Sequence, residues 1–146
     1  MRLRRLTIVP GLAACVAAAG LAIPPDALSS ASAKSVAITA CKSVVRKSVY
    51  KCLGPYTLGI PASAPKVAFH VVTMGSWGPA TVTFNILDVA SRQPLVNPVS
   101  VNPGRAYKTG FLWWFGLNGP FPKTTIVITT TVGGKMVGAG QIFRFV

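Results

Sequence analysis

Very few residues in this chain could carry acid–base chemistry. The 146-residue sequence contains one histidine, His70, and two carboxylic acids, of which only Asp88 lies beyond the N-terminal leader. A nucleophilic triad needs a histidine within hydrogen-bond reach of an acid. A hairpin that turns at Trp77 would place Asp88 opposite Lys66, and His70 would then lie four steps, or about 13 Å, away along the ladder. We therefore expect no triad, and we interpret His70 as a half-buried strand residue.

Other reaction classes also lack the residues they require. Glycoside hydrolysis commonly uses two carboxylates that flank the scissile bond, and the chain after residue 33 contains one. One histidine, one aspartate and an oxidised cysteine pair do not supply three adjacent metal ligands. The sequence has neither a phosphate-binding loop nor a dinucleotide motif. We therefore expect a protein that is not an enzyme and that uses no cofactor and no metal.

Cys41 and Cys52 are the two cysteines that remain after removal of a leader, and exported chains commonly pair their cysteines. The apolar spacing between them also suits a helix, with the basic residues on the opposite side. A straight helix would hold the two sulfur atoms about 16 Å apart, which no disulfide spans. A hairpin about Arg46 and Lys47 brings the cysteines opposite each other, and its valines suit strands. The sequence therefore predicts a disulfide-closed hairpin.

The predicted hairpin carries the highest local charge in the chain. Its basic residues are Lys42, Arg46, Lys47 and Lys51, with no acid among them. Without the three arginines and one aspartate of the first 33 residues, the chain keeps twelve cations and one acid, a net charge of +11. Such a charge favours polyanions through long-range attraction and counterion release. We take these four residues as the candidate polyanion-binding site; the alternative is a charge that only keeps an apolar protein soluble.

The densest aromatic run begins at Gly110 and reads Gly-Phe-Leu-Trp-Trp-Phe-Gly. Alternation along a strand places three of its aromatic residues on one face: Phe111, Trp113 and Phe115. Trp114 faces the other way, so the strand is either covered on both sides or presents Trp114 to a partner. We interpret the first three as core, and Trp77 and Trp114 as candidates for an aromatic surface, with core packing as the alternative.

The N-terminus has the pattern of an export signal. Arginines at positions 2, 4 and 5 precede a mostly apolar run, and Ala31-Ser32-Ala33 offers the small residues that a signal peptidase recognises. The sequence therefore predicts a signal peptide over residues 1–33 and a secreted or surface-associated chain without a transmembrane segment. The alternative is a lipoprotein, because Leu12-Ala13-Ala14-Cys15 resembles a lipobox whose cysteine, Cys15, would be acylated.

Strand-like segments follow one another about every eleven residues, separated by glycine and proline turns. The expected segments are 67–74, 80–89, 95–101, 106–115, 124–132 and 135–146. Asn102-Pro103-Gly104-Arg105 suits a type II turn, and Gly133-Gly134 suits a two-residue hairpin turn. No segment after Lys66 has a helical period. Residues 34–146 are therefore predicted to form a single all-β domain, an antiparallel β-sandwich of immunoglobulin-like or jelly-roll type with seven to nine strands. A small open-ended barrel is the alternative.

These observations favour a secreted, cationic, non-enzymatic binding protein directed at anionic cell-envelope polymer or an anionic lipid surface, with no nucleic-acid partner. In this function Trp77 or Trp114 would stack on sugar rings. The alternative is an exported antagonist, either a cationic antimicrobial or an inhibitor of another secreted protein, whose aromatic residues enter a lipid interface or a partner's pocket. An exposed tryptophan on a sheet face favours the first function, and tryptophan and phenylalanine at a loop tip ringed by lysine favour the second.

Overall fold

The computed structural model describes residues 33–146, so the predicted signal peptide and the lipobox at Cys15 lie outside the described residues, apart from Ala33. Nine strands make up the secondary structure of this part of the chain: β1 (Ser35–Arg46), β2 (Tyr50–Pro55), β3 (Lys66–Met74), β4 (Val82–Asp88), β5 (Val99–Val101), β6 (Leu112–Asn118), β7 (Thr125–Val132), β8 (Lys135–Met136) and β9 (Gln141–Arg144). Between residues 33 and 146, no helix is long and apolar enough to cross a membrane.

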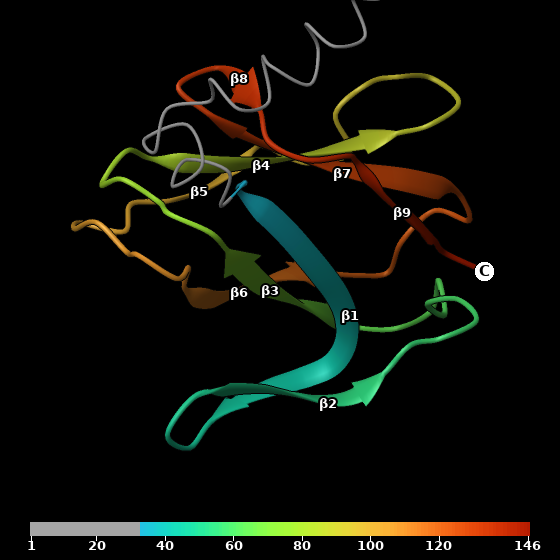
Figure 1. The fold of residues 1–146 in the computed structure, drawn as a ribbon. Coiled ribbons are helices and arrows are strands. Elements are labelled where there is room, and N and C mark those ends of the chain that lie inside the picture. Colours follow the sequence, from blue (N-terminus) through green and yellow to red (C-terminus); the bar gives the residue numbers. More distant parts are fainter. Residues whose placement is uncertain (1–32) are drawn as a thin grey trace, which may run out of the picture. The chain divides into compact units, whose positions relative to one another are not determined.

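The strands form two antiparallel sheets (Figure 1). The first has the order β2-β1-β3-β6, and the second has the order β5-β4-β7, with β8 and β9 both pairing with β7. The predicted all-β class, antiparallel pairing and number of strands are therefore confirmed for the described residues. The predicted edge strand over 95–101 is also present, although only its last three residues, β5, pair regularly with β4.

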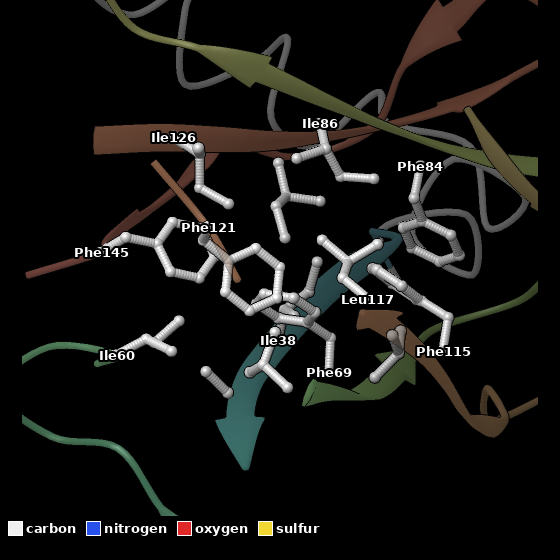
Figure 2. Packing of buried hydrophobic residues seen from close by; sticks show 14 of the residues in the cluster. Ile38, Ile60, Phe69, Phe84, Ile86, Phe115, Leu117, Phe121, Ile126 and Phe145 are labelled. Atoms are coloured by element: carbon white, nitrogen blue, oxygen red, sulfur yellow. The ribbon is translucent and has the colours of Figure 1, made fainter. Parts of the chain in front are cut away.

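The core lies between the inner faces of the two sheets, where aromatic rings from three strands meet (Figure 2). Phe115 of β6 stacks on Phe69 of β3 and on Phe84 of β4, with ring centroids 5.3 Å apart in both pairs. All three side chains are buried, and strand alternation explains why, since each occupies an inward position of its strand. Aromatic pairs of this kind stabilise a core beyond the apolar area they bury.

The predicted hairpin between β3 and β4 is wrong, because these two strands belong to different sheets. Lys66 pairs with Asn118 of β6 instead of Asp88, and His70 pairs with Trp114 instead of Phe84. Residues 75–81 therefore cross from one sheet to the other. His70 and Asp88 still do not meet, but the reason is that they lie in separate sheets.

Trp77 explains why the connection crosses between the sheets. Its indole is only 1 % exposed, and its Nε1 donates a hydrogen bond to the Met74 carbonyl oxygen at 2.9 Å. Its backbone exchanges two hydrogen bonds with Tyr107, at 2.8 and 2.7 Å. The indole thus fills the end of the core instead of lying at an exposed turn. Trp77 as part of an aromatic surface is therefore also a wrong prediction.

Residues 102–111 form a loop, so β6 begins at Leu112 and not at residue 106 as predicted. The end of this loop is held by Thr73, whose Oγ1 donates to the Phe111 carbonyl oxygen at 2.7 Å and accepts from the Phe111 N–H at 2.6 Å. Gly110 has a φ of +94°, and a Cβ at this position would overlap the Thr73 carbonyl. Only glycine fits there, because the chain adopts a left-handed conformation in direct contact with β3.

Gln141 of β9 joins the two sheets at one edge of the sandwich. Its Oε1 accepts a hydrogen bond from the Ile38 N–H at 2.8 Å, and its Nε2 donates to the Val36 carbonyl oxygen at 2.9 Å. The amide thereby pairs with the backbone of β1 as a neighbouring strand would. Gly133-Gly134 forms the predicted hairpin turn between β7 and β8, with φ values of +58° and +79°.

Candidate functional site

The cysteine-closed hairpin is present. Cys41 and Cys52 are joined by a disulfide with Cα atoms 5.7 Å apart, and Arg46 pairs with Tyr50 around a turn at residues 47–49. The register differs from the prediction, because Cys52 lies opposite Val44. In a straight ladder an offset of three residues separates the positions by about 10 Å. The bond therefore depends on the sharp bend in β1 that Figure 1 shows.

The bend folds the hairpin over the first sheet. The part of β1 before Cys41 pairs with β3, and the part after it pairs with β2. The hairpin lies on the side of β3 and β6 that faces away from the second sheet, and β2 contacts both strands. His70 and Trp114, which pair across β3 and β6, are consequently half-buried. The His70 Nε2 is buried without a hydrogen-bond partner.

Trp77 and Trp114 do not form a common aromatic surface. Trp77 is in the core, whereas Trp114 is on the outer face of the first sheet. The Nζ of Lys66 lies 5.7 Å from the centre of the Trp114 ring. The indole therefore already has a cationic neighbour, and the hairpin covers part of the same face.

The four predicted polyanion-binding residues are all exposed, but they do not form one cluster. Strand alternation and the register place Lys42 and Arg46 on one face of the hairpin and Lys51, opposite Val45, on the other. The stem of Lys42 lies against Gly54 of β2. Lys47 lies in the turn. The predicted site is therefore divided, and one of its four residues, Arg46, lines the cavity between the hairpin turn and the loop 102–111.

That cavity has a volume of about 640 Å³ and lies between the hairpin turn and the loop 102–111. Arg46 and Tyr50 line it from the hairpin, and Arg105 and Tyr107 line it from the loop. Each guanidinium lies over the neighbouring tyrosine ring, at 5.5 Å for Arg46 over Tyr50 and 4.9 Å for Arg105 over Tyr107. Such cation–π contacts favour one orientation of an otherwise mobile side chain. Two exposed guanidinium groups thus stand at the mouth of one cavity.

Aromatic residues from β6 and the preceding loop form the remaining wall of the cavity. Phe111 packs edge-on against Trp77 with ring centroids 5.6 Å apart, and Trp113 stacks on Phe84 at 5.8 Å. Both side chains are half-buried, so part of each ring is accessible from the cavity. Packing against the buried rings of Trp77 and Phe84 fixes the positions of these two side chains.

The cavity opens at the end of the sandwich where positive charge gathers, which we call the cationic end. Pairing of Val82 with both Val101 and Val132 brings the β3–β4 loop, the β5–β6 loop and the β7–β8 turn to this end. Pairing of Ser35 with Met74 adds the start of β1, and the cavity lining adds the hairpin turn. Six of the twelve cations after residue 33 lie here: Lys34, Arg46, Lys47, Arg105, Lys108 and Lys135. No acidic side chain lies among them, because Asp88 ends β4 about 20 Å from its beginning.

Asp88 is held at the opposite end by its own hydrogen bonds. Its Oδ2 accepts from the Thr124 hydroxyl at 2.6 Å, and its Oδ1 accepts from the N–H groups of Ala90 and Ser91, each at 2.8 Å. The Thr124 bond first, and then the backbone bonds, hold the pKa of the carboxyl below its ordinary value of 3.8. The carboxylate is therefore ionised at neutral pH, and it is hydrogen-bonded to groups at the end of the sandwich opposite the cavity.

The sequence pointed to Arg46 but gave no sign that Arg105 and Tyr107 line the same cavity. The two arginines are 59 positions apart in the sequence, and they share a cavity because the hairpin bends toward the loop. Among residues 33–146, no three histidine, cysteine or acidic side chains are grouped so that they could hold a metal ion. Comparison of the chain with family models, with curated proteins and with solved structures finds no match.

Proposed function

We propose that this chain is an exported, non-enzymatic binding protein that holds anionic cell-envelope polymer with its cationic end. The observation that supports this function best is the uneven charge along the strands: six cations and no acid at one end, against four cations and the single acid of the described residues at the other. Clustered positive charge attracts a polyanion and releases its counterions, and an extended polymer can contact several such groups at once.

We further propose that the fold is immunoglobulin-like. The strand orders β1-β3-β6 and β5-β4-β7-β9 correspond to A-B-E and C′-C-F-G of that fold, with β2 as an addition. Neither β3 nor β7 contains cysteine, so the disulfide that joins strands B and F in antibody domains has no counterpart. In this correspondence the cationic end carries the B–C and F–G connections, the end at which variable domains hold their binding loops.

The exported antagonist is less well supported. Such a protein needs large aromatic side chains that can enter a lipid interface or a partner's pocket. Between residues 33 and 146, none of the exposed large apolar side chains is aromatic, and every tryptophan and phenylalanine is buried or half-buried. The exposed apolar residues at the cationic end are Val49, Met74 and Met136, and the most exposed one, Leu58, lies in the connection between β2 and β3.

The test compares two variants that each lose four positive charges. The first carries glutamine at the cationic-end lysines Lys34, Lys47, Lys108 and Lys135, and leaves both cavity arginines in place. The second, a matched control, carries glutamine at cations of the opposite end: Lys66, Arg92, Lys123 and Arg144. Binding of the purified protein to isolated cell-wall polymer is measured by co-sedimentation across a series of salt concentrations.

The first variant should lose most of the affinity for the polymer, and its binding should depend less steeply on salt because fewer counterions are displaced. The control variant should bind nearly as the native protein does. Equal losses in the two variants would mean that net charge alone determines binding. Binding of the native protein that does not weaken with salt would also contradict the proposal.

A further inference from the structure

We propose that the cavity between the hairpin turn and the loop 102–111 is a subsite for one sugar ring that carries a carboxylate or phosphate group. This inference rests on the proposed function, because it names the repeating unit that the cationic end recognises. The cavity volume of about 640 Å³ lies within the range of small-molecule sites, about 300–1,000 Å³. The cavity can therefore hold a ring and its substituents, which a flat charged surface cannot.

The anionic group is assigned to the two arginines at the mouth. A guanidinium presents its N–H donors as a planar fork, which matches a carboxylate or phosphate with two parallel hydrogen bonds. Arg46 and Arg105 come from opposite walls, and no acidic side chain competes for them, since Asp88 lies at the other end of β4. Each guanidinium lies over the face of a tyrosine ring, a contact that does not use its N–H groups as hydrogen-bond donors. In this proposal an anion between the walls accepts hydrogen bonds from both arginines.

The sugar ring is assigned to the aromatic wall. A sugar has an apolar face of C–H groups and a polar edge of hydroxyl groups, so it suits a site that combines aromatic and polar surfaces. Phe111, Trp113 and Tyr107 supply the aromatic surface, and Asn102 and Ser48 add polar groups to the lining. Inorganic phosphate alone would leave the aromatic side chains of the cavity in contact with water, so it would use only the arginines. A lipid headgroup would bring acyl chains to a rim whose exposed large apolar residue is only Val49.

The walls of the cavity are fixed before any ligand arrives. The disulfide anchors the base of the hairpin, the Trp77–Tyr107 backbone bonds anchor the middle of the loop, and Thr73 anchors Phe111. The cost of ordering the site on binding is therefore small, which favours recognition of a single small unit. Diffuse attraction of a polymer needs no such rigidity.

The test uses a variant that keeps every charge and removes only the guanidinium forks, Arg46→Lys with Arg105→Lys. The matched control is Arg92→Lys with Arg144→Lys, which makes the same change at the opposite end. The probes are a short oligosaccharide with glucuronic acid units, glucose 1-phosphate, a neutral glucose oligosaccharide, inorganic phosphate and phosphatidylglycerol vesicles. Binding is followed by calorimetry and by the NMR signal of the Trp113 indole N–H.

The glucuronic acid oligosaccharide or glucose 1-phosphate, or both, should bind and shift the Trp113 signal, and whichever binds identifies the anionic group. The neutral oligosaccharide and inorganic phosphate should bind at least about tenfold more weakly, since each lacks one half of the recognised unit. The cavity variant should lose about tenfold or more in affinity for the charged sugar, whereas the control should not. The control variant should retain native binding to cell-wall polymer. In the cavity variant, which keeps every positive charge of the cationic end, polymer binding should depend on salt as steeply as in the native protein even where its affinity falls.

Polymer binding without any binding of the charged sugars would overturn the subsite and leave the proposed function intact. Loss of polymer binding by the native protein would instead refute the proposed function. If the cavity variant bound charged sugar as tightly as the native protein does, the sugar would bind outside this cavity. The same conclusion would follow if the charged sugar bound without shifting the Trp113 signal. Preference for the phosphatidylglycerol vesicles over both charged sugars would contradict a saccharide ligand.

Discussion

Replacing Thr73 by valine tests how the loop wall of the cavity is held. The substitution keeps the size and shape of a side chain that is 3 % exposed and removes its hydroxyl. The Phe111 N–H then loses the acceptor that it has at 2.6 Å. The Phe111 carbonyl oxygen loses one donor at 2.7 Å but keeps the Thr73 backbone N–H at 3.0 Å. The main effect should therefore come from the N–H group.

The expected change in stability follows from three contributions. A buried donor without a partner costs about 1–3 kcal/mol, and loss of the second hydrogen bond costs about 1 kcal/mol. The methyl group that replaces the hydroxyl contributes about 1 kcal/mol of apolar burial in the opposite direction. The free energy of unfolding should thus fall by about 2 kcal/mol, which lowers the melting temperature of a domain of this size by about 8 °C.

Urea unfolding measures the difference, with Thr73→Ser as the control. Serine retains the hydroxyl and loses only the methyl group, so the free energy of unfolding of this variant should be about 1 kcal/mol lower than that of the native protein. The Phe111 amide should keep its slow hydrogen exchange. The valine variant should exchange that amide faster and bind charged sugar more weakly, because Phe111 lines the cavity. A valine variant as stable as the native protein would refute this account of the loop.

Three further changes address the rest of the framework. Gln141→Met keeps the side-chain length but removes both hydrogen bonds to β1, so urea unfolding should show a loss of about 2 kcal/mol. Changing Cys41 and Cys52 together to serine removes the disulfide, and the free energy of unfolding should fall by about 3 kcal/mol in the chain-entropy model. Asp88→Asn removes a carboxylate whose pKa is lower in the folded state than the ordinary value of 3.8. The stabilisation from that carboxylate is complete above the unfolded-state pKa and is lost as the pH falls through the folded-state pKa. The variant should therefore melt at a lower temperature than the native protein at pH 7, with the gap closing in acid below the folded-state pKa.

Each of these expectations has an outcome that contradicts it. A Gln141→Met variant of native stability would mean that water forms equally favourable hydrogen bonds with the Ile38 N–H and the Val36 carbonyl oxygen. A variant without the Cys41–Cys52 disulfide that kept native stability and native sugar affinity would show that strand pairing alone holds the hairpin. For Asp88, a melting-temperature difference that stays the same from pH 7 to acid would exclude the carboxylate charge as its cause.

The local pattern of the sequence located most strands after Lys66, because each depends on neighbouring residues. The single strand expected over 135–146 is wrong, since it is divided into β8 and β9, and the part of β1 before Cys41 was not predicted. Alternation of apolar and polar residues located β4, and two adjacent glycines located the turn before β8. The cysteine pair predicted the hairpin, since a disulfide excludes a helix of that length. Alternation says which residues share a face, however, and does not say which strands pair. The assignment of β3 and β4 to one sheet failed for this reason.

Long-range contacts explain the remaining failures. Trp77 had the sequence context of an exposed turn, but its indole fills the end of the core and donates a hydrogen bond to Met74. Arg105 was one basic residue in a proline-glycine turn, and its place in the same cavity as Arg46 depends on the bend in β1. No local pattern encodes that bend, because the disulfide joins positions that are not opposite each other in the ladder.

The uneven charge along the strands, net +6 at the cationic end and net +3 at the other, also gives the molecule an electric dipole. A field from an anionic surface would exert a torque that turns the cationic end toward it, so the protein should land upright and not on a sheet face. The Val146 N–H donates a hydrogen bond to the Ile60 carbonyl oxygen at 2.9 Å, at the end away from the hairpin turn (Figure 1). An upright layer would therefore carry Val146 on its outer side, where a label attached to this residue would not block the polymer.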